Sequence, residues 1–140
     1  MQKPNIGDLT GIWTYRSVLN DPNLARDFND LEFGRANIEI ASAPMGVLIG
    51  RIYDTGWELK LQGAIGYGNP WNVRFQGTGT VDGEPWVYDY TGFVVPPWPN
   101  GIDQRPAITG SIVRTLTHSH GKALAGVTAS FYAVCQDAAK

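Results

Sequence analysis

Apolar and polar residues alternate along much of the chain, most regularly in two segments of seven residues. Residues 57–63 (WELKLQG) and 71–77 (WNVRFQG) each place an apolar side chain at every second position and end that series on a glycine. A period of two is typical of a half-buried β-strand, because successive side chains point to opposite faces. Both segments are therefore predicted to be strands that bury one face.

The same ending, a large apolar residue, any residue and then glycine, recurs along the chain. From Gly50 onward the repeats are spaced as a strand followed by a turn would be, and turn residues fall between them. The sequence predicts eight strands, at about 8–17, 33–41, 46–53, 57–65, 71–80, 85–95, 106–116 and 123–135.

One segment between the first two strands has a helical pattern instead. Asp21 is placed as an N-cap, and Leu24, Phe28 and Leu31 follow at helical spacing, which predicts a short helix over 22–31. Strands joined in sequence order form a meander, and a meander of this size hides its edges by closing. The predicted fold is all-β: a single domain over 1–140, forming an eight-stranded antiparallel up-and-down β-barrel with one short helix.

The recurring glycines set the phase of each strand, because the residue two before a glycine shares its face. The opposite face carries Glu58, Lys60 and Arg74, whose burial as unpaired ions would cost several kcal/mol each. The interior therefore holds the aromatic set, which supplies the candidate ligand-binding residues. These are Trp13, Tyr15, Trp57, Phe75, Trp86, Tyr88, Tyr90, Arg114 and Tyr132.

An interior of this width is either filled by side chains or holds one small ligand. Both interpretations, a ligand cavity and a packed core, remain open from the sequence. The glycines fit either interpretation, since they let strands coil tightly and also leave room.

Gly11-Ile12-Trp13 on the first strand, with Arg114 on a late strand, resembles the calycin signature. Residues 9–13 and 48–53 are also similar to strands of avidin-like barrels. The resemblance implies a lipocalin- or avidin-type barrel in which Arg114 stacks on the indole of Trp13. The residues after Trp13, at 14–17, lack the pattern of a biotin site, so biotin is not implied.

Composition and charge argue against several classes of binding partner. Charged residues make up 17% of the chain and the net charge is −2, so no broad basic field indicates nucleic acid. No apolar run is long enough to span a membrane and no signal segment opens the chain, which predicts a cytoplasmic protein. Cys135 is the only cysteine, and His118 and His120 lack a third ligand, so a solvated turn is favoured and neither metal nor cofactor is expected.

Four residues are candidates for chemistry. Tyr88 and Tyr90 could hydrogen-bond or protonate a bound carbonyl, and Arg114 could pair with a ligand anion if it is not purely structural. Glu39 would be the best general acid or base if it faced inward, but its strand cannot be phased, and Arg35 on the same strand shares that ambiguity. The proline-rich loop at 96–101 carries Trp98, either as a lid or within an ordered connection.

The last two strands show apolar residues on both faces, which indicates a subunit interface and a homodimer or larger homo-oligomer. The outward members are predicted to be Val113, Val127, Ala129, Phe131 and Ala133. Three functions follow: binding of a small apolar molecule, a cofactor-independent isomerase or cyclase acting on an apolar carbonyl compound, or a purely structural barrel. Binding is the leading hypothesis.

Overall fold

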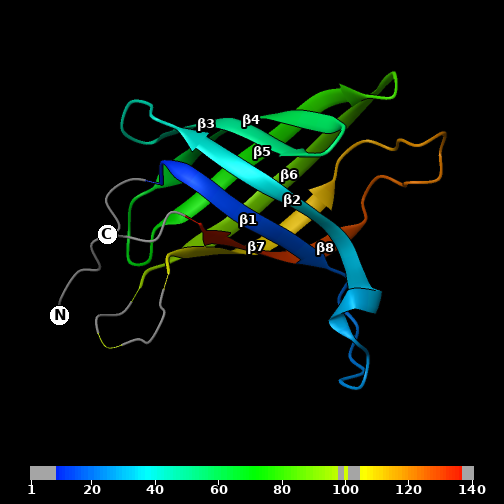
Figure 1. The fold of residues 1–140 in the computed structure, drawn as a ribbon, viewed down its shortest axis with the longest axis horizontal. Helices are drawn as coiled ribbons and strands as arrows, with labels where there is room; N and C mark the ends of the chain where they lie inside the picture. The colour runs from blue at the N-terminus through cyan, green and yellow to red at the C-terminus, as the bar shows by residue number, and fades with distance from the viewer. Residues whose placement is uncertain (1–8, 98–99, 101–104, 137–140) are drawn as a thin grey trace.

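Eight antiparallel strands follow one another around a closed barrel in the computed structural model, which describes residues 9–97, 100 and 105–136 (Figure 1). Each strand pairs with the next along the chain, and β8 pairs with β1 to close the wall. The strands are β1 (Gly11–Val18), β2 (Glu32–Ala41), β3 (Val47–Asp54), β4 (Trp57–Gly66), β5 (Asn72–Val81), β6 (Glu84–Val95), β7 (Ala107–Arg114) and β8 (Thr128–Cys135). The predicted fold class is confirmed.

The short helix between the first two strands is present as one 3₁₀ turn, η1 (Phe28–Leu31), with Asp27 as its N-cap. Asp21 instead accepts a hydrogen bond from the backbone N–H of Asn23. Asn23 does the same for Ala25. Side chains that bond the backbone two residues ahead favour turns over a continuous helix. The helix is therefore shorter than its apolar spacing predicted. Among the described residues no helix is long and apolar enough to cross a membrane.

Inward-facing positions agree with the predicted phase on β1 and on β3 to β7; the phase of β2 was left open by the sequence. Tyr15, Ile52, Leu59 and Tyr90 are buried. The ion pair of Arg51 with Glu58 lies on the outer face. The alternation of the sequence therefore placed the apolar face correctly on these strands.

The predicted phase of β8 is wrong. Ile112 faces the interior and pairs with Ala129, and residues directly opposite in a sheet share a face. Ala129, Phe131 and Ala133 are consequently buried, whereas Tyr132 is 41% exposed. The predicted phase rests on Gly126, which lies before the strand at a φ of +87°. The expected outward apolar strip thus loses three of its five residues, and with them the main argument for a subunit interface.

The recurring glycines let neighbouring strands approach closely. A Cβ at Gly50 would lie 1.8 Å from the carbonyl oxygen of Glu39, and one at Gly110 would lie 1.9 Å from that of Thr91. At Gly63 the distance to the carbonyl oxygen of Arg74 would be 2.1 Å. Real Cβ atoms cannot occupy such positions, so these glycines shape the wall of the barrel.

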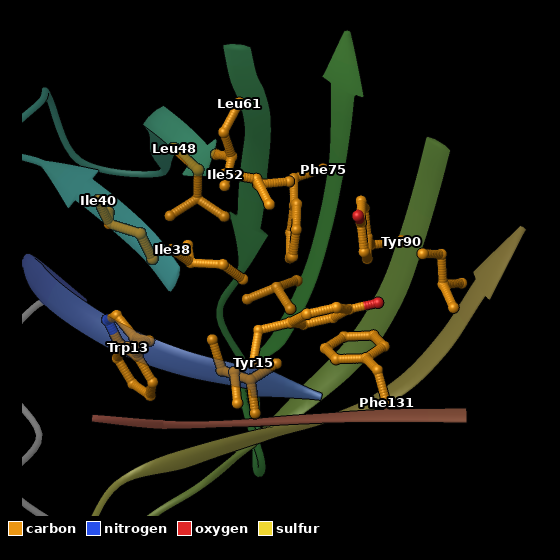
Figure 2. Close-up of a cluster of buried hydrophobic side chains, with 14 of the residues drawn as sticks. Trp13, Tyr15, Ile38, Ile40, Leu48, Ile52, Leu61, Phe75, Tyr90 and Phe131 are labelled. Atoms are coloured by element: carbon orange, nitrogen blue, oxygen red, sulfur yellow. The ribbon is translucent and has the colours of Figure 1, made fainter. Parts of the chain in front are cut away.

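One end of the barrel is solidly packed. Leu9, Trp13, Leu48, Leu61 and Val73 are at most 2% exposed and lie where β1, β3 and β5 begin. The indole N–H of Trp13 donates to the carbonyl oxygen of Leu9 at 3.0 Å, which satisfies its one buried donor. Figure 2 shows Trp13, Leu48 and Leu61 in this cluster, with Tyr15, Tyr90 and Phe131 at its far side.

Candidate ligand cavity

A cavity of about 340 Å³ occupies the other end of the barrel, where β1, β3 and β7 end and β2, β4 and β6 begin. Its volume lies within the range of small-molecule sites. The walls are largely aromatic and aliphatic, with a few polar groups. The main lining residues are Tyr15, Phe33, Ile52, Trp57, Leu59, Trp86, Tyr88, Tyr90, Ile112, Arg114 and His118.

Tight turns bring two indoles to this end. Trp57 follows the turn at Thr55 and Gly56, and Trp86 lies just after the turn at Asp82 and Gly83. Asp82 and Gly83 both have positive φ, as a two-residue hairpin turn of type I′ requires. The two indole rings lie 6.3 Å apart between centroids. The two tight turns therefore place a pair of large flat rings at the cavity.

Tyr88, His118 and Arg114 form a polar cluster in the cavity wall. The Tyr88 hydroxyl lies 2.7 Å from Nε2 of His118, and Nε of Arg114 donates to it at 3.2 Å. Nδ1 of His118 lies 2.8 Å from the hydroxyl of Ser119. One consistent assignment has Tyr88 donating to Nε2 while the Nδ1–H donates to Ser119. The phenol, imidazole and guanidinium are thus joined by hydrogen bonds.

His118 reaches this cluster because the segment after β7 folds back over the barrel end. Its backbone N–H and carbonyl both bond to Ala123, and its ring stacks on Trp86 at 3.9 Å between centroids. His118 is 4% exposed, whereas His120 is exposed. The prediction of a turn is confirmed, but that of a solvated His118 is wrong. Among the described residues no three His, Cys, Asp or Glu side chains are grouped to hold a metal.

The electrostatics of the cavity favour neutral side chains around one cation. Burial lowers the pKa of His118, and the nearby Arg114 lowers it further, while Glu84 acts in the opposite direction. Burial also raises the pKa of Tyr15 and of Tyr90. At neutral pH His118 is therefore uncharged and both phenols keep their protons.

Two buried polar atoms of the lining side chains have no hydrogen-bond partner among the described residues. They are the hydroxyl of Tyr15 and the indole N–H of Trp86. Ser17 and Tyr90 are polar neighbours of Tyr15, but neither lies in hydrogen-bonding geometry with its hydroxyl. Buried polar groups are ordinarily paired, so each orphan indicates a place where a ligand atom would fit.

The calycin resemblance implied that Arg114 stacks on Trp13, but the two residues are not in contact. Its guanidinium lies 4.8 Å from the ring centroid of Phe33, and NH1 donates to the carbonyl oxygen of Leu124 at 3.2 Å. Arg114 ends β7, whereas Trp13 pairs with Cys135 at the level where β7 begins. The arginine and the indole therefore lie at opposite ends of the barrel.

Six of the predicted binding residues line the cavity: Tyr15, Trp57, Trp86, Tyr88, Tyr90 and Arg114. Trp13 belongs to the packed end, and Phe75 lies outside the lining, stacked on Tyr90 at 4.6 Å. Tyr132 is on the outer face, as described above. Trp98 is not among the described residues.

Glu39 lies on the outer wall of the barrel. Its carboxylate accepts a hydrogen bond from Nε of Arg51 at 2.8 Å, while Ile38 and Ile40 on either side are buried. The inward orientation on which its catalytic candidacy depended is therefore not found. Arg35 is 62% exposed at the cavity mouth.

Sequence reasoning missed Phe33 and His118, whose rings lie 6.4 and 5.8 Å from that of Tyr88. Phe33 is the second residue of β2, a strand that carries no recurring glycine in phase, so no local pattern fixed its face. His118 is in a turn whose fold-back is set by contacts with β6, including the bond from Thr115 N–H to the carbonyl of Val87. No pattern in the sequence predicts that contact.

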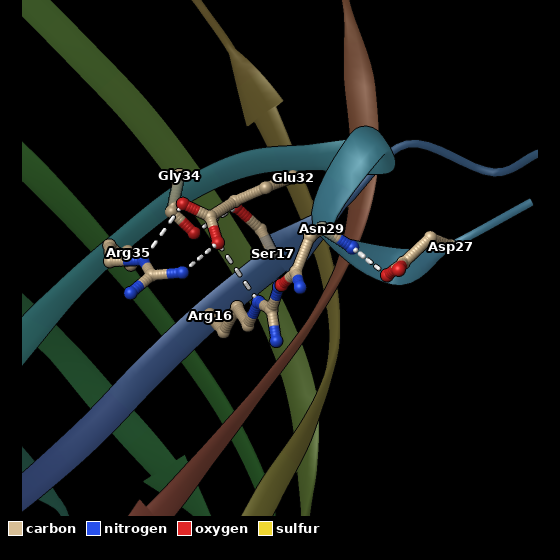
Figure 3. A network of polar contacts seen from close by, with 7 residues as sticks. All are labelled: Arg16, Ser17, Asp27, Asn29, Glu32, Gly34 and Arg35. Carbon is tan, nitrogen blue, oxygen red and sulfur yellow. Dashed lines mark hydrogen bonds and ion pairs between the residues drawn. The ribbon is translucent and has the colours of Figure 1, made fainter.

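An ion-pair network holds the mouth in shape (Figure 3). Glu32 accepts hydrogen bonds from Arg35 at 2.8 and 2.6 Å and from Arg16 at 3.0 Å. Arg16 also bonds to Asn29 of η1. The hydrogen bond from Arg35 is the main reason that the pKa of Glu32 lies below its usual value. These contacts tie η1, β1 and β2 together at the rim.

No protein-family model, curated protein or solved structure matches this chain.

Proposed function

We propose that the barrel binds a small, largely apolar molecule in the cavity at the end where β2, β4 and β6 begin. The observation that carries the proposal is a space of about 340 Å³ with aromatic walls, beside an end of the same barrel that is fully packed. Unfilled apolar space forfeits dispersion contacts with its lining. A bound molecule would restore those contacts.

The closed up-and-down barrel and the Gly11-Ile12-Trp13 motif support a place among calycin-like barrels of the lipocalin or avidin type. A barrel of eight strands is wide enough to hold one small ligand inside. The position of Arg114 differs from the signature, so the support comes from topology and from the hollow end.

A cavity-filling variant tests the proposal. Ala36 lines the cavity on β2, and Ala36→Phe would put a ring into the space, whereas Ala64→Phe adds the same ring to the exposed outer face of β4. The probe is 2-acetylnaphthalene, a flat neutral ketone, and binding is followed by quenching of tryptophan fluorescence. We expect Ala36→Phe to weaken binding by about tenfold or more, which corresponds to about 1.4 kcal/mol, and Ala64→Phe to leave it unchanged.

Two outcomes contradict the proposal: no binding by the unaltered protein, or equal binding by Ala36→Phe. Far-UV circular dichroism shows that each variant keeps its strands.

One observation favours a second candidate, a cofactor-independent isomerase or cyclase acting on an apolar carbonyl compound. Tyr88, His118 and Ser119 are connected by contacts of 2.7 and 2.8 Å, an arrangement through which a proton can move to or from a bound molecule. Exchange of the methyl protons of bound 2-acetylnaphthalene with D₂O, followed by NMR, separates the two functions. If the unaltered protein catalyses exchange and Tyr88→Phe abolishes it at unchanged affinity, the enzyme is supported. If the unaltered protein shows no more exchange than Tyr88→Phe, binding alone is supported.

A further inference from the structure

We propose that the molecule held in this cavity carries an anionic group, specifically a carboxylate, received by Arg114 beside Tyr88 and Trp86. The ligand class is then small apolar acids. This inference rests on the proposed binding function and specifies the chemistry of that same site.

No carboxylate of the described residues balances the charge of Arg114. Arg16, Arg26, Arg35 and Arg51 each pair with a carboxylate at 3.4 Å or less. Among the described residues no carboxylate lies within salt-bridge distance of Arg114, which is partly buried in the cavity wall. The other basic side chains without an ion pair in the described chain are exposed to solvent; they are Lys60, Arg74, Arg105 and Lys122. Among the basic residues that the structure describes, Arg114 alone combines partial burial with the lack of an anion, a costly arrangement unless a ligand supplies one.

The hydrogen-bonding groups of the site also require acceptors. A guanidinium has five N–H donors, and those of Arg114 meet only the Tyr88 hydroxyl and the Leu124 carbonyl oxygen among the described residues. The indole N–H of Trp86 is a further donor without a partner, and its ring lies 6.3 Å from that of Tyr88. A carboxylate brings two oxygens that only accept, so it fits the surplus of donors on this wall.

The amount of charge favours a monoanion. The lowered pKa of His118 keeps that ring neutral, and Arg35 at the mouth is already paired with Glu32. Glu84, the acid that acts on His118, is engaged by the backbone N–H of His120 at 3.1 Å. One unbalanced cation matches one carboxylate, whereas a phosphate dianion would leave a charge uncompensated.

The rest of the ligand is set by the remaining lining residues. Trp57 and Leu59 present apolar surface, and the hydroxyl of Tyr15, which has no hydrogen-bond partner among the described residues, lies at a second place. The site therefore fits an apolar body, preferably flat, with the carboxylate at one end. An acceptor atom near Tyr15 would satisfy the second orphan donor.

A pair of isosteric probes tests the inference. 2-Naphthoate and 2-naphthamide have nearly the same shape, but only the first is charged at pH 7.5. We expect the unaltered protein to bind the naphthoate about tenfold more tightly or better, because a hydrogen bond to a charged group is stronger than a neutral one. Affinities are measured by calorimetry and by quenching of tryptophan fluorescence.

Three variants locate the preference. Arg114→Gln should bind the two probes equally, Arg114→Lys should keep part of the preference, and Arg74→Gln on the exposed outer face should match the unaltered protein. If Arg114→Gln fails to fold, as judged by circular dichroism, Arg114→Lys still tests the assignment. A full tenfold preference in Arg114→Gln would overturn the role of Arg114.

The outcomes separate this inference from the function on which it rests. Equal binding of both probes by the unaltered protein overturns the anionic ligand and leaves the apolar cavity as proposed. Binding of neither probe overturns both. Binding of the naphthamide alone also rejects the anionic ligand, because Arg114 should attract the charged naphthoate rather than exclude it.

Discussion

Two tyrosines in the cavity wall have opposite hydrogen-bonding states. The hydroxyl of Tyr15 is buried without a partner among the described residues, whereas that of Tyr88 contacts both His118 and Arg114. Leaving a buried polar group unpaired costs about 1–3 kcal/mol, and a formed hydrogen bond contributes about 1 kcal/mol. The same change, Tyr to Phe, should therefore have opposite effects at the two positions.

In the ligand-free protein, we expect Tyr15→Phe to raise the free energy of unfolding by about 1 kcal/mol and Tyr88→Phe to lower it by a similar amount. Urea unfolding followed by circular dichroism measures both, and each variant is the control for the other. A loss of stability in Tyr15→Phe would show that its hydroxyl is satisfied in solution.

His118 should make the stability of the fold depend on pH. Its pKa is lowered in the folded state by burial, and then by Arg114, from the ordinary value of 6.5. Between the lowered value and 6.5 the unfolded chain binds a proton that the folded chain does not, so stability falls as the pH falls through this window. Glu84 works against this effect, and Arg114, Tyr88 and Ser119 are the other polar groups that face the ring.

Urea midpoints at pH 7.5 and 5.5 test this expectation. The decrease on acidification should be smaller in His118→Gln than in the unaltered protein, and His120→Gln, at an exposed position, should leave it unchanged. Equal decreases in all three proteins would show that His118 is not the source of the acid sensitivity.

At the residue scale, the sequence predicted which side chains face inward on every strand except β2 and β8, but not how deep they lie. Alternation is a local property, so it grouped Trp13 and Phe75 with Tyr15, Trp86 and Tyr88 on one face. The height of a residue along the barrel depends on the stagger between strands, which is set by long-range pairing. Trp13 therefore belongs to the packed end although its phase is right.

Among the elements, β6 and β7 show why glycine is needed where it recurs. A Cβ at Gly110 would lie 1.9 Å from the carbonyl oxygen of Thr91 and 2.5 Å from the Cα of Gly92. Both obstacles are backbone atoms, so accommodation would require the two strands to separate. At Gly34 on β2, by contrast, the nearest atom is the hydroxyl oxygen of Ser17 at 3.6 Å, an ordinary contact.

We expect Gly110→Ala to lower the free energy of unfolding by about 2 kcal/mol or more, since overpacking a fitted wall forces the backbone to move. Gly34→Ala should change it by less than about 0.5 kcal/mol. Thermal unfolding of the two variants makes the comparison. Similar small effects at both positions would mean that the wall yields more easily than the close contacts indicate.

The two elements that sequence patterns described least well are both interrupted by turns. In the segment before β2, Asp21 and Asn23 bond to the backbone two residues ahead, and the helix shrinks to η1. Before β8, Gly126 adopts a left-handed conformation, so the strand begins at Thr128 with the other face inward. In each case local side-chain or backbone geometry outweighed the spacing of apolar residues.

For the whole molecule, the alternatives of a filled and a hollow barrel are both found, at opposite ends. Trp13 and Leu61 fill one end, and the cavity bounded by Trp57 and Trp86 occupies the other. Composition and alternation give only the average content of the interior. They cannot predict where along the barrel axis the side chains pack and where space is left, because this depends on which strand ends meet.

Closure of the barrel also bears on the order in which strand pairings form during folding. Every strand pairing joins neighbours in sequence except that of β1 with β8, where Thr14 bonds to Val134 across 120 positions. Hairpins of consecutive strands close short loops, whereas this last pairing closes nearly the whole chain at a larger entropic cost. Tyr15 on β1 and Arg114 on β7, the strand beside β8, become walls of one space only when that seam forms. We therefore expect the proposed binding site to form last as the protein folds, so that a ligand would stabilise the finished barrel without guiding its assembly.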